Sequence, residues 1–231
     1  MTETERKDLL AAYADLRVCD VRDGMDAIGF HFFGSMGPEI CPLHRTRAFG
    51  IAKTVRYLPY RGGVFFADPR QYRDEFTPRY YSEVCTYPWT AELREGDFVV
   101  IDQSGVRVGL IGSENPLACW NKGMRGLVTN GGIRDTDEII AQQIPCWSAV
   151  IAQTMVQARL AFDRMNEPVA VGGVQVRTGD VIVADGDGVI AVPQEIAREV
   201  ARYAHEEHDN DKRNRRKLYD AAGRTHDASL A

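Results

Sequence analysis

The sequence has few cysteines and no long apolar run. Its five cysteines lie far apart and never form a C-x-x-C pair, which argues against a disulfide framework and against a zinc knuckle. Residues 1–16 (MTETERKDLLAAYADL) carry charges throughout, so they lack the apolar centre of a signal peptide or a membrane span. We therefore expect reduced, buried thiols in a cytoplasmic protein that has no membrane partner.

The chain also lacks a strong charge of either sign. Its 28 basic and 33 acidic residues give a formal net charge of −5, which does not favour nucleic acid as a partner. No motif repeats with a period of roughly 20 to 50 residues, so a solenoid is excluded. A content of 44% hydrophobic and 26% charged residues is typical of a globular protein, and no linker divides the chain. These features predict one domain over residues 1–231.

Helices are predicted near the start of the chain, and strands follow them. Residues 1–16 are amphipathic, and in residues 18–30 apolar side chains such as Val21 and Met25 recur at helical spacing until Gly29. Short apolar stretches bounded by glycine or proline then predict strands at residues 47–58, 96–105, 106–112, 125–130 and 146–153. Residues 168–193 add β-branched strands with tight turns. Helices and strands together indicate an α/β protein.

Two long segments stand apart from this pattern. The connection at about 59–95 is too long for a simple loop, which indicates a cover or a binding loop. It is dense in arginine and tyrosine, including Arg61, Tyr72, Arg73, Tyr80 and Tyr81. The segment at about 195–222 predicts a long, strongly charged helix that follows Pro193.

The stretch TNGGIRDTDEI, residues 129–139, joins a predicted strand to a predicted helix. Two glycines predict a tight turn directly before Arg134 and Asp135. The residues after them contain acids in the first helical turn, where the helix dipole favours negative charge. We therefore predict that Arg134 and Asp135 lie at the point where a strand ends and a helix begins.

A second turn of the same kind lies in GLIGSEN, residues 109–115. Gly112 precedes Arg134 by 22 positions, and two strand-to-helix turns related in this way can lie side by side at one edge of a sheet. Backbone N–H groups after Gly112 and the guanidinium of Arg134 would both attract an anion. Asp135 brings the opposite charge, and a divalent cation between Asp135 and the anion resolves this conflict.

Three stretches together resemble the RraA-like superfamily, which includes the 4-hydroxy-4-methyl-2-oxoglutarate / 4-carboxy-4-hydroxy-2-oxoadipate aldolases. They are LIGSEN (110–115), GLVTNGGIRDTDEI (126–139) and GGVQVRTGDVIVADGDGVIAVP (172–193). The resemblance covers most of the chain. It implies a single-domain αββα sandwich with mixed central sheets, assembled into homotrimers or homohexamers with active sites between subunits.

The resemblance also implies roles for individual residues. Asp135 would hold Mg²⁺ or Mn²⁺, with Glu138 supporting the ion from further away or through water, and Arg134 would bind a 2-oxo acid. The backbone from Gly112 to Asn115, with Ser113 and Glu114 between them, would hold the substrate carboxylate. An acid from the C-terminal region of a neighbouring subunit would complete the site, and the candidates are Glu206, Glu207 and Asp211.

The chemistry that fits these parts is retro-aldol cleavage or β-decarboxylation of a 2-oxo acid through a pyruvate enolate. A divalent metal stabilises the negative charge on the C2 oxygen as a Lewis acid, and an arginine adds a hydrogen-bond donor there. The alternative is a non-catalytic regulator that binds a protein such as an RNA-degrading endonuclease, as the superfamily's namesake does. A methyltransferase is not supported, because no glycine-rich nucleotide loop precedes an acid at the required distance.

Several motifs have a simpler interpretation beside the functional one. GGIRDTDE could be a strand-to-helix turn in which Asp135 or Asp137 caps the helix and Arg134 forms a surface ion pair. His205 and His208 could bind a metal, although a heavily charged helix favours a solvated face. DKRNRRK (211–217) is a short basic run that favours a solvated or subunit-contacting face over nucleic acid. ADGDGVIAVP (184–193) favours a tight hairpin over a calcium loop.

Overall fold

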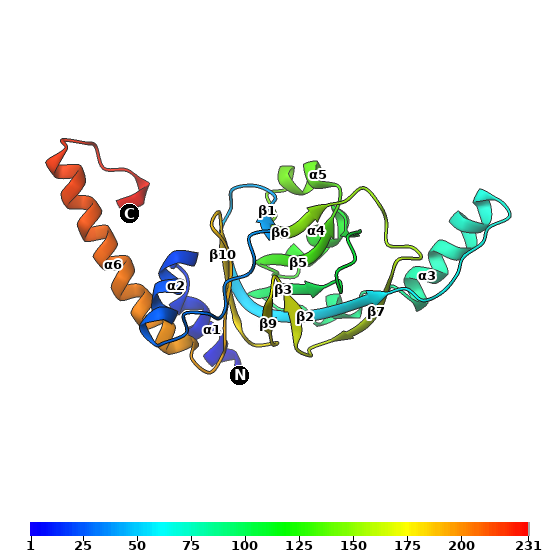
Figure 1. The fold of residues 1–231 in the computed structure, drawn as a ribbon, viewed down its shortest axis with the longest axis horizontal. Helices are drawn as coiled ribbons and strands as arrows, with labels where there is room; N and C mark the ends of the chain where they lie inside the picture. The colour runs from blue at the N-terminus through cyan, green and yellow to red at the C-terminus, as the bar shows by residue number, and fades with distance from the viewer. Residues whose placement is uncertain (231) are drawn as a thin grey trace.

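Figure 1 shows the computed structural model, which describes residues 1–230. A nine-stranded mixed sheet forms its centre, in the order β1-β6-β5-β3-β2-β10-β11, with β4 paired to β5 and β7 paired to β2. These strands are β1 (Cys41–Pro42), β2 (Ala48–Pro59), β3 (Asp97–Asp102), β4 (Gly109–Ile111), β5 (Gly126–Ile133), β6 (Cys146–Ile151), β7 (Leu160–Met165), β10 (Val181–Asp185) and β11 (Gly188–Val192). A separate hairpin joins β8 (Val169–Val171) to β9 (Val174–Val176). The predicted α/β class with a mixed sheet is confirmed.

The centre of the sheet is parallel, and its two sides are antiparallel. Strand β3 runs parallel to both β2 and β5, and β5 runs parallel to β6. Every residue of β3 is buried, because both faces of this part of the sheet are covered. The twelve-residue strand β2 pairs with β10 near its start and with β7 near its end, so it bends the sheet around the core (Figure 1).

Helices cover two ends of the sheet. Helices α1 (Glu3–Ala12), α2 (Val18–Ala27) and α6 (Ala197–Ala221) form one apolar cluster with β10 and β11. Helix α2 ends where predicted, since Gly29 has a φ of +89°. Helices α4 (Glu114–Trp120) and α5 (Thr136–Ala141) are short and follow β4 and β5 directly. Together they place two helix starts at one edge of the sheet.

The long connection projects from the body of the molecule (Figure 1, cyan). It contains a π-helical segment (Gln71–Phe76), helix α3 (Thr77–Glu83) and a 3-10 turn (Pro88–Glu92). An aromatic row of Phe66, Tyr72, Phe76 and Tyr80 holds it together, with paired ring centroids between 5.0 and 6.1 Å apart. The chain returns to the core at Trp89, which is fully buried.

The structure corrects three expectations from the sequence and adds one strand. Gly131 and Gly132 belong to β5 and not to a turn, because the strand continues to Ile133. All five cysteines are free, as expected, but Cys19 and Cys41 are exposed. Strand β7 was not predicted, because its sequence LAFDRM alternates weakly. His208 is buried on a helix that was expected to be solvated there.

Two expectations about local structure hold. The segment 184–193 is a tight hairpin in which Asp185 pairs with Gly188. The charged C-terminal helix is present as α6, from Ala197 to Ala221. Within residues 1–230, no helix is both long enough and apolar enough to cross a membrane.

Candidate active site

A cleft of about 520 Å³ opens where β4 and β5 end and α4 and α5 begin. The segment 109–115 forms one side of it, and Arg134 and Asp135 form the other. Tyr81 and Tyr87 from the long connection and Met155 from the loop after β6 close the remaining sides. The structure therefore brings together the two sequence motifs that were predicted to share a site.

Strand pairing explains why the motifs meet. Strands β4 and β5 are parallel neighbours, with Gly109 opposite Gly132 and Ile111 opposite Ile133. The carboxyl ends of parallel strands lie at the same edge of a sheet, where ligands bind in many α/β folds. Each strand is followed by a helix, so the two strand-to-helix junctions face each other. Gly112 and Arg134, which lie 22 positions apart in the sequence, are therefore neighbours in the structure.

Glycines at the two ends of β4 make room for the charged pair. A Cβ atom added to Gly109 would lie 2.8 Å from Cγ of Arg134, and one added to Gly112 would lie 2.6 Å from Oδ2 of Asp135. Both distances are shorter than real carbon contacts. The two glycines therefore let the side chains of Arg134 and Asp135 approach the backbone of the neighbouring segment.

The glycines of β5 do not form the turn that the sequence predicted. A Cβ atom on Gly131 would meet the buried side chain of Gln103 at 2.1 Å, and one on Gly132 would meet the carbonyl oxygen of Val108 at 2.7 Å. The pairing of β5 with β6 also shifts register between Thr129 and Gly132. Close packing and a bulge, and not a positive φ, explain why glycine is needed here.

Asp135 is the residue at which the backbone turns. It has a φ of +54° and a ψ of 42°, in the left-handed region that non-glycine residues rarely adopt. It occupies the N-cap position of α5, but its side chain makes no capping hydrogen bond. Its Oδ2 instead lies 3.4 Å from the amide nitrogen of Ser113, which donates to it. The helix-capping alternative therefore does not describe Asp135.

Arg134 is held in place by its neighbour. Its Nε donates to Oδ1 of Asp135 at 3.1 Å, and both side chains are about one-third exposed, at 29% and 35%. Among residues 1–230 no hydrogen-bond partner is found for the two terminal guanidinium nitrogens. The part of Arg134 that can form a two-pronged contact with a carboxylate is therefore free to face the cleft.

Two tyrosines form the outer wall of the cleft. Burial raises the pKa of the Tyr81 hydroxyl, and the nearby positive charge of Arg134 opposes this rise. Burial also raises the pKa of Tyr87 well above its ordinary value, and its hydroxyl donates to the carbonyl of Leu110 at 3.0 Å. Both hydroxyls are thus neutral at physiological pH. The sequence pointed to the connection, but it did not single out Tyr87 or Met155.

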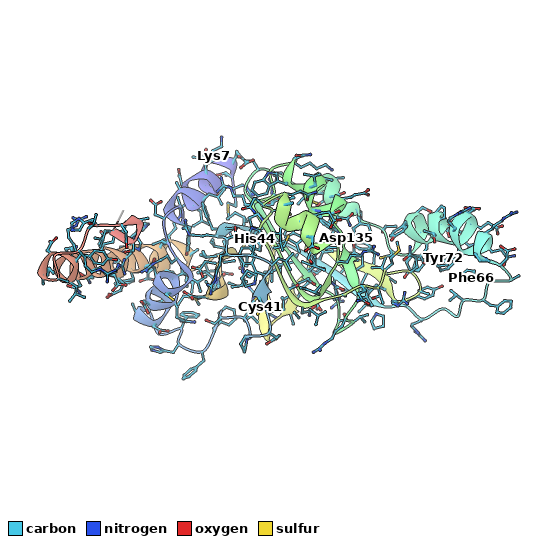
Figure 2. The ribbon with its side chains drawn as sticks, turned by 90° about the horizontal axis from the view of Figure 1, so that it is seen from above. Lys7, Cys41, His44, Phe66, Tyr72 and Asp135 are labelled. Carbon is cyan, nitrogen blue, oxygen red and sulfur yellow. The ribbon has the colours of Figure 1, made fainter. Side chains whose placement is uncertain are left out.

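The other predicted site residues have different positions. Ser113, Glu114 and Asn115 line the cleft, as predicted. Glu138 is exposed on α5 and does not line the cleft, so its support of a metal stays a prediction. Of the arginines and tyrosines expected in the connection, only Tyr81 lines the cleft, and Figure 2 shows Tyr72 far from Asp135 on the projecting part.

The candidate acids belong to α6, which Figure 1 shows at one end of the molecule, away from α4 and α5. Glu206 pairs with Arg202 at 3.1 Å, and Asp211 pairs with Arg215 at 3.2 Å and with Arg17 at 3.3 Å. Glu207 is exposed. None of them can reach the cleft of its own chain, so a role in the site requires a neighbouring subunit.

The two histidines of α6 have structural contacts. Nδ1 of His208 lies 2.9 Å from Oδ2 of Asp20, and both side chains are almost fully buried. Nε2 of His205 lies 2.9 Å from the carbonyl oxygen of Ala12. These contacts attach α6 to α2 and α1. They give the histidines a packing role in place of the solvated face that was expected.

The acidic residues of the cleft can be compared with the ligands that a divalent cation needs. Asp135 and Glu114 supply two carboxylates, and no cluster of three or more His, Cys, Asp or Glu side chains that could hold a metal is found within residues 1–230. Mg²⁺ is commonly bound through one or two carboxylates together with water and substrate oxygens. The donor set therefore fits such an ion and does not fit an all-protein cage.

Comparison with known proteins identifies relatives of this chain. A family model described as Aldolase/RraA, of the RraA-like family, matches residues 17–191. A 4-hydroxy-4-methyl-2-oxoglutarate aldolase of Thermus thermophilus is 31% identical over 101 residues, which are 43% of this chain and 60% of the relative. The chain thus spans about 60% of the length of the curated relatives it matches.

Solved structures share the fold over nearly the whole chain. One, described among novel cellulases from microbes associated with the gut ecosystem, has a TM-score of 0.74 and 27% identity, covering 92% of this chain and 89% of that chain. Another is Streptomyces coelicolor RraAS2, described as an unusual member of the RNase ES inhibitor RraA family. It has a TM-score of 0.71 and 23% identity, covering 90% of this chain and 96% of that chain.

Proposed function

The chain belongs to the RraA-like (Aldolase/RraA) family, and we propose that it is a divalent-metal-dependent lyase that cleaves a 2-oxo acid. The reaction is a retro-aldol cleavage or a β-decarboxylation that forms pyruvate enolate. One observation carries this proposal: Arg134 and Asp135 converge on the segment 112–115 in a single cleft. Relatives named as 4-hydroxy-4-methyl-2-oxoglutarate aldolases support it.

Each residue of the cleft has a proposed task. The free end of Arg134 binds the 2-oxo acid, and the amide groups of Glu114 and Asn115 hold its carboxylate. Asp135 holds Mg²⁺ or Mn²⁺, which supplies Lewis-acid stabilisation of the C2 carbonyl when bound. The 3.4 Å contact from the amide of Ser113 orients the carboxylate of Asp135 toward this position.

The same C3–C4 bond breaks in both reactions. In retro-aldol cleavage the C4 hydroxyl loses its proton to water, the C3–C4 bond breaks, and its electron pair moves toward the C2 oxygen. In decarboxylation the C3–C4 bond breaks and CO₂ leaves. Arg134 donates hydrogen bonds to the negative charge that develops, and one such donor contributes roughly 3 kcal/mol. The enolate then takes up a proton at C3 and leaves as pyruvate.

The test is a pyruvate-release assay with a panel of 2-oxo acids. The protein is first treated exhaustively with a chelator, its metal content is verified, and Mg²⁺ or Mn²⁺ is then restored. We expect turnover only with added metal, and no lysine lies within residues 129–139 to form a Schiff base in its place. Full turnover by the metal-free protein would contradict metal dependence.

The regulatory alternative has a test of its own. The structure of RraAS2 shares the fold at 23% identity, and a likeness at that level shows the fold alone. A regulator has no need for a free guanidinium next to a carboxylate in a cleft. Absence of pyruvate release from every 2-oxo acid tried, together with inhibition of an RNA-degrading endonuclease, would favour regulation over catalysis.

A further inference from the structure

Three tyrosines of the long connection pack together, and the protein itself uses two of their hydroxyls. The hydroxyl of Tyr80 donates to the carbonyl oxygen of Val156 at 2.9 Å, and that of Tyr87 donates to the carbonyl oxygen of Leu110 at 3.0 Å. The ring centroid of Tyr81 lies 6.3 Å from that of Tyr80 and 6.5 Å from that of Tyr87. Within residues 1–230 no backbone carbonyl accepts a hydrogen bond from the Tyr81 hydroxyl. Of the three, Tyr81 therefore has the hydroxyl that is free to serve a ligand.

Tyr81 lines the cleft together with Arg134. Burial raises the pKa of the Tyr81 hydroxyl, so the phenol keeps its proton at physiological pH. The positive charge of Arg134 opposes that rise in pKa, because it stabilises the phenolate that loss of the proton would leave. A neutral phenol near a fixed positive charge can give up a proton and take it back, as a general acid does.

A buried amide lies close to the same tyrosine. Gln157 is 2% exposed, and within residues 1–230 neither its Oε1 nor its Nε2 has a hydrogen-bond partner. The preceding residue, Val156, accepts the hydrogen bond of Tyr80, so the loop that carries Gln157 is attached to the tyrosines. Gln157 is also near enough to the Tyr81 hydroxyl to oppose the rise that burial causes in its pKa. An unpaired amide in the interior costs free energy, so its presence requires an explanation.

A partner that exists only during the reaction explains this amide. When Tyr81 gives up its proton, the phenolate oxygen becomes a strong acceptor, and the N–H groups of Gln157 can donate to it. The amide is then paired when Tyr81 is charged and unpaired when Tyr81 is neutral. An arrangement of this kind stabilises the charged form selectively, which favours proton donation.

We infer that Tyr81 is the proton donor of the lyase reaction and that Gln157 positions and stabilises it. The inference rests on the proposed function, in which the pyruvate enolate takes up a proton at C3. The Tyr81 O–H bond breaks, and the electron pair of the enolate C=C bond forms the new C3–H bond. Tyr81 remains as a phenolate and regains its proton from water.

Exchange of the methyl hydrogens of pyruvate measures this step by itself. The reverse of proton donation removes a C3 proton from pyruvate, so the proton NMR signal of the methyl group should disappear in D₂O when wild-type protein and Mg²⁺ are present. Tyr81→Phe removes only the hydroxyl, and we expect exchange and pyruvate release to slow by at least about a hundredfold. Calorimetric titration with oxalate, a planar analogue of the enolate without a C3 hydrogen, should give a Kd within about threefold of wild type.

Tyr60→Phe is the matched control for Tyr81→Phe. Tyr60 and Tyr81 pack against the same apolar cluster, but Tyr60 does not line the cleft, so Tyr60→Phe should exchange pyruvate at the wild-type rate. Equal exchange by the two variants would overturn the inference and assign the proton to another group, such as the acid predicted from a neighbouring subunit. A loss of oxalate affinity in Tyr81→Phe as large as its loss of exchange would make Tyr81 a binding residue and would overturn the inference as well.

Gln157→Leu tests the positioning role, because leucine has a similar size and no amide. Both polar atoms of Gln157 lack partners in the folded protein, so we expect Tm to stay the same or to rise. The kcat of pyruvate release should fall by at least about tenfold with KM unchanged, since a hydrogen bond to the charged phenolate is lost. A lower Tm with an unchanged kcat would make Gln157 a packing residue and would contradict the positioning role.

The wild-type protein separates this inference from the proposed function. Pyruvate release together with exchange, both slowed in Tyr81→Phe, supports both statements. Exchange that persists in Tyr81→Phe overturns the inference and leaves the lyase proposal intact. Pyruvate release without exchange would show that the enolate takes its proton in solution, with the same consequence. Neither release from any 2-oxo acid nor exchange would contradict the lyase proposal, and the inference with it.

Discussion

Asp135 combines an unfavourable backbone conformation with an unsatisfied helix-capping position. A φ of +54° costs a non-glycine residue of the order of 1 kcal/mol, although aspartate and asparagine tolerate it better than most. In return, its carboxylate points toward Ser113 and the cleft and not toward the first turn of α5. Backbone strain of this kind is a feature of binding sites.

Two replacements of Asp135 should distinguish the effect of its charge from the effect of its backbone conformation. Asp135→Asn keeps the shape and tolerates the left-handed region, so we expect Tm to stay within about 2 °C of wild type while turnover falls to background and Mg²⁺ binding weakens. Asp135→Ala should abolish turnover as well and lose about 1 kcal/mol of stability more than Asp135→Asn. Calorimetric metal titration and thermal melts check this. Near-normal activity in Asp135→Asn would refute a metal-binding role.

Arg134→Lys should impair substrate binding without affecting the metal. An ammonium group cannot reproduce the planar, two-pronged contact of a guanidinium with a carboxylate. We expect kcat/KM to fall about a hundredfold, which corresponds to roughly 3 kcal/mol, with Mg²⁺ affinity and Tm unchanged. If both Arg134→Lys and Asp135→Asn were as active as wild type, the segment would be only a strand-to-helix junction.

Gly112→Ala tests whether close approach positions the carboxylate. The added Cβ would lie 2.6 Å from Oδ2 of Asp135, so that carboxylate must move. A displacement of about 1 Å can cost a hundredfold in rate, and we expect a loss of that order in kcat. Gly63→Ala is the matched control, because a Cβ added to Gly63 would meet no atom within 4 Å and this glycine lies outside the cleft. Equal kinetics of the two variants would contradict the positioning argument.

At the scale of elements, the contact between α2 and α6 depends on a buried carboxylate. Asp20 accepts a hydrogen bond from the backbone nitrogen of Arg17 at 2.8 Å, as N3 of a capping box, and its side chain is 2% exposed. Burial alone would raise the pKa of Asp20, but the hydrogen bonds and charge of Arg17 and the charge of His208 outweigh it, so that the pKa is lowered. Asp20 therefore stabilises the start of α2 as well as its contact with α6.

This lowered pKa predicts the pH dependence of stability. The folded state binds the proton of Asp20 less tightly than the unfolded state, so its contribution is present above the ordinary aspartate pKa of about 3.9 and is lost as the pH falls below it. Asp20→Asn should lower the free energy of unfolding by about 3 kcal/mol at pH 7, since it breaks a buried pair. Urea unfolding at several pH values should show this difference constant above about pH 5 and shrinking below about pH 4. A difference that does not change with pH would exclude the charge of Asp20 as its cause.

At the scale of the whole molecule, the distal half of α6 lies far from α4 and α5, whose first residues border the cleft (Figure 1). The helix extends beyond the body of the chain (Figure 1), and its residue Leu218 is 69% exposed. We predict that α6 contacts a neighbouring subunit in a trimer or hexamer, and that one of Glu206, Glu207 and Asp211 completes the neighbour's cleft.

Subunit complementation tests this prediction. A triple variant with Glu206, Glu207 and Asp211 replaced by alanine and the variant Asp135→Asn should each be inactive. The two variants are then unfolded and refolded together to form mixed oligomers. These should regain activity, because some clefts combine an intact Asp135 from one subunit with intact acids from the other. Sedimentation measures the assembly state in parallel. A fully active monomer would contradict a shared site. A triple variant that is active by itself, while the mixed oligomers are inactive, would contradict it as well.

The amino-acid sequence determined the elements that have strong local signals. Glycine stops α2 at Gly29, the apolar run of 98–101 forms a buried strand, and the alternation in 181–192 forms a hairpin. The pairing of Gly112 with Arg134 and Asp135 was also predicted, because two strand-to-helix junctions in one chain have few ways to meet at a sheet edge. Local patterns and simple topology rules are therefore enough to predict these elements and the meeting of the two junctions.

The tertiary structure alone decided how the site is built. Gly131 and Gly132 are needed because Gln103 and Val108 pack against them, which no local pattern reveals. Tyr87 and Met155 reach the cleft from segments outside both motifs, and His208 is buried because α2 supplies Asp20 opposite it. Each of these facts is a contact between distant segments. A sequence records which side chains are present, whereas packing decides which of them meet.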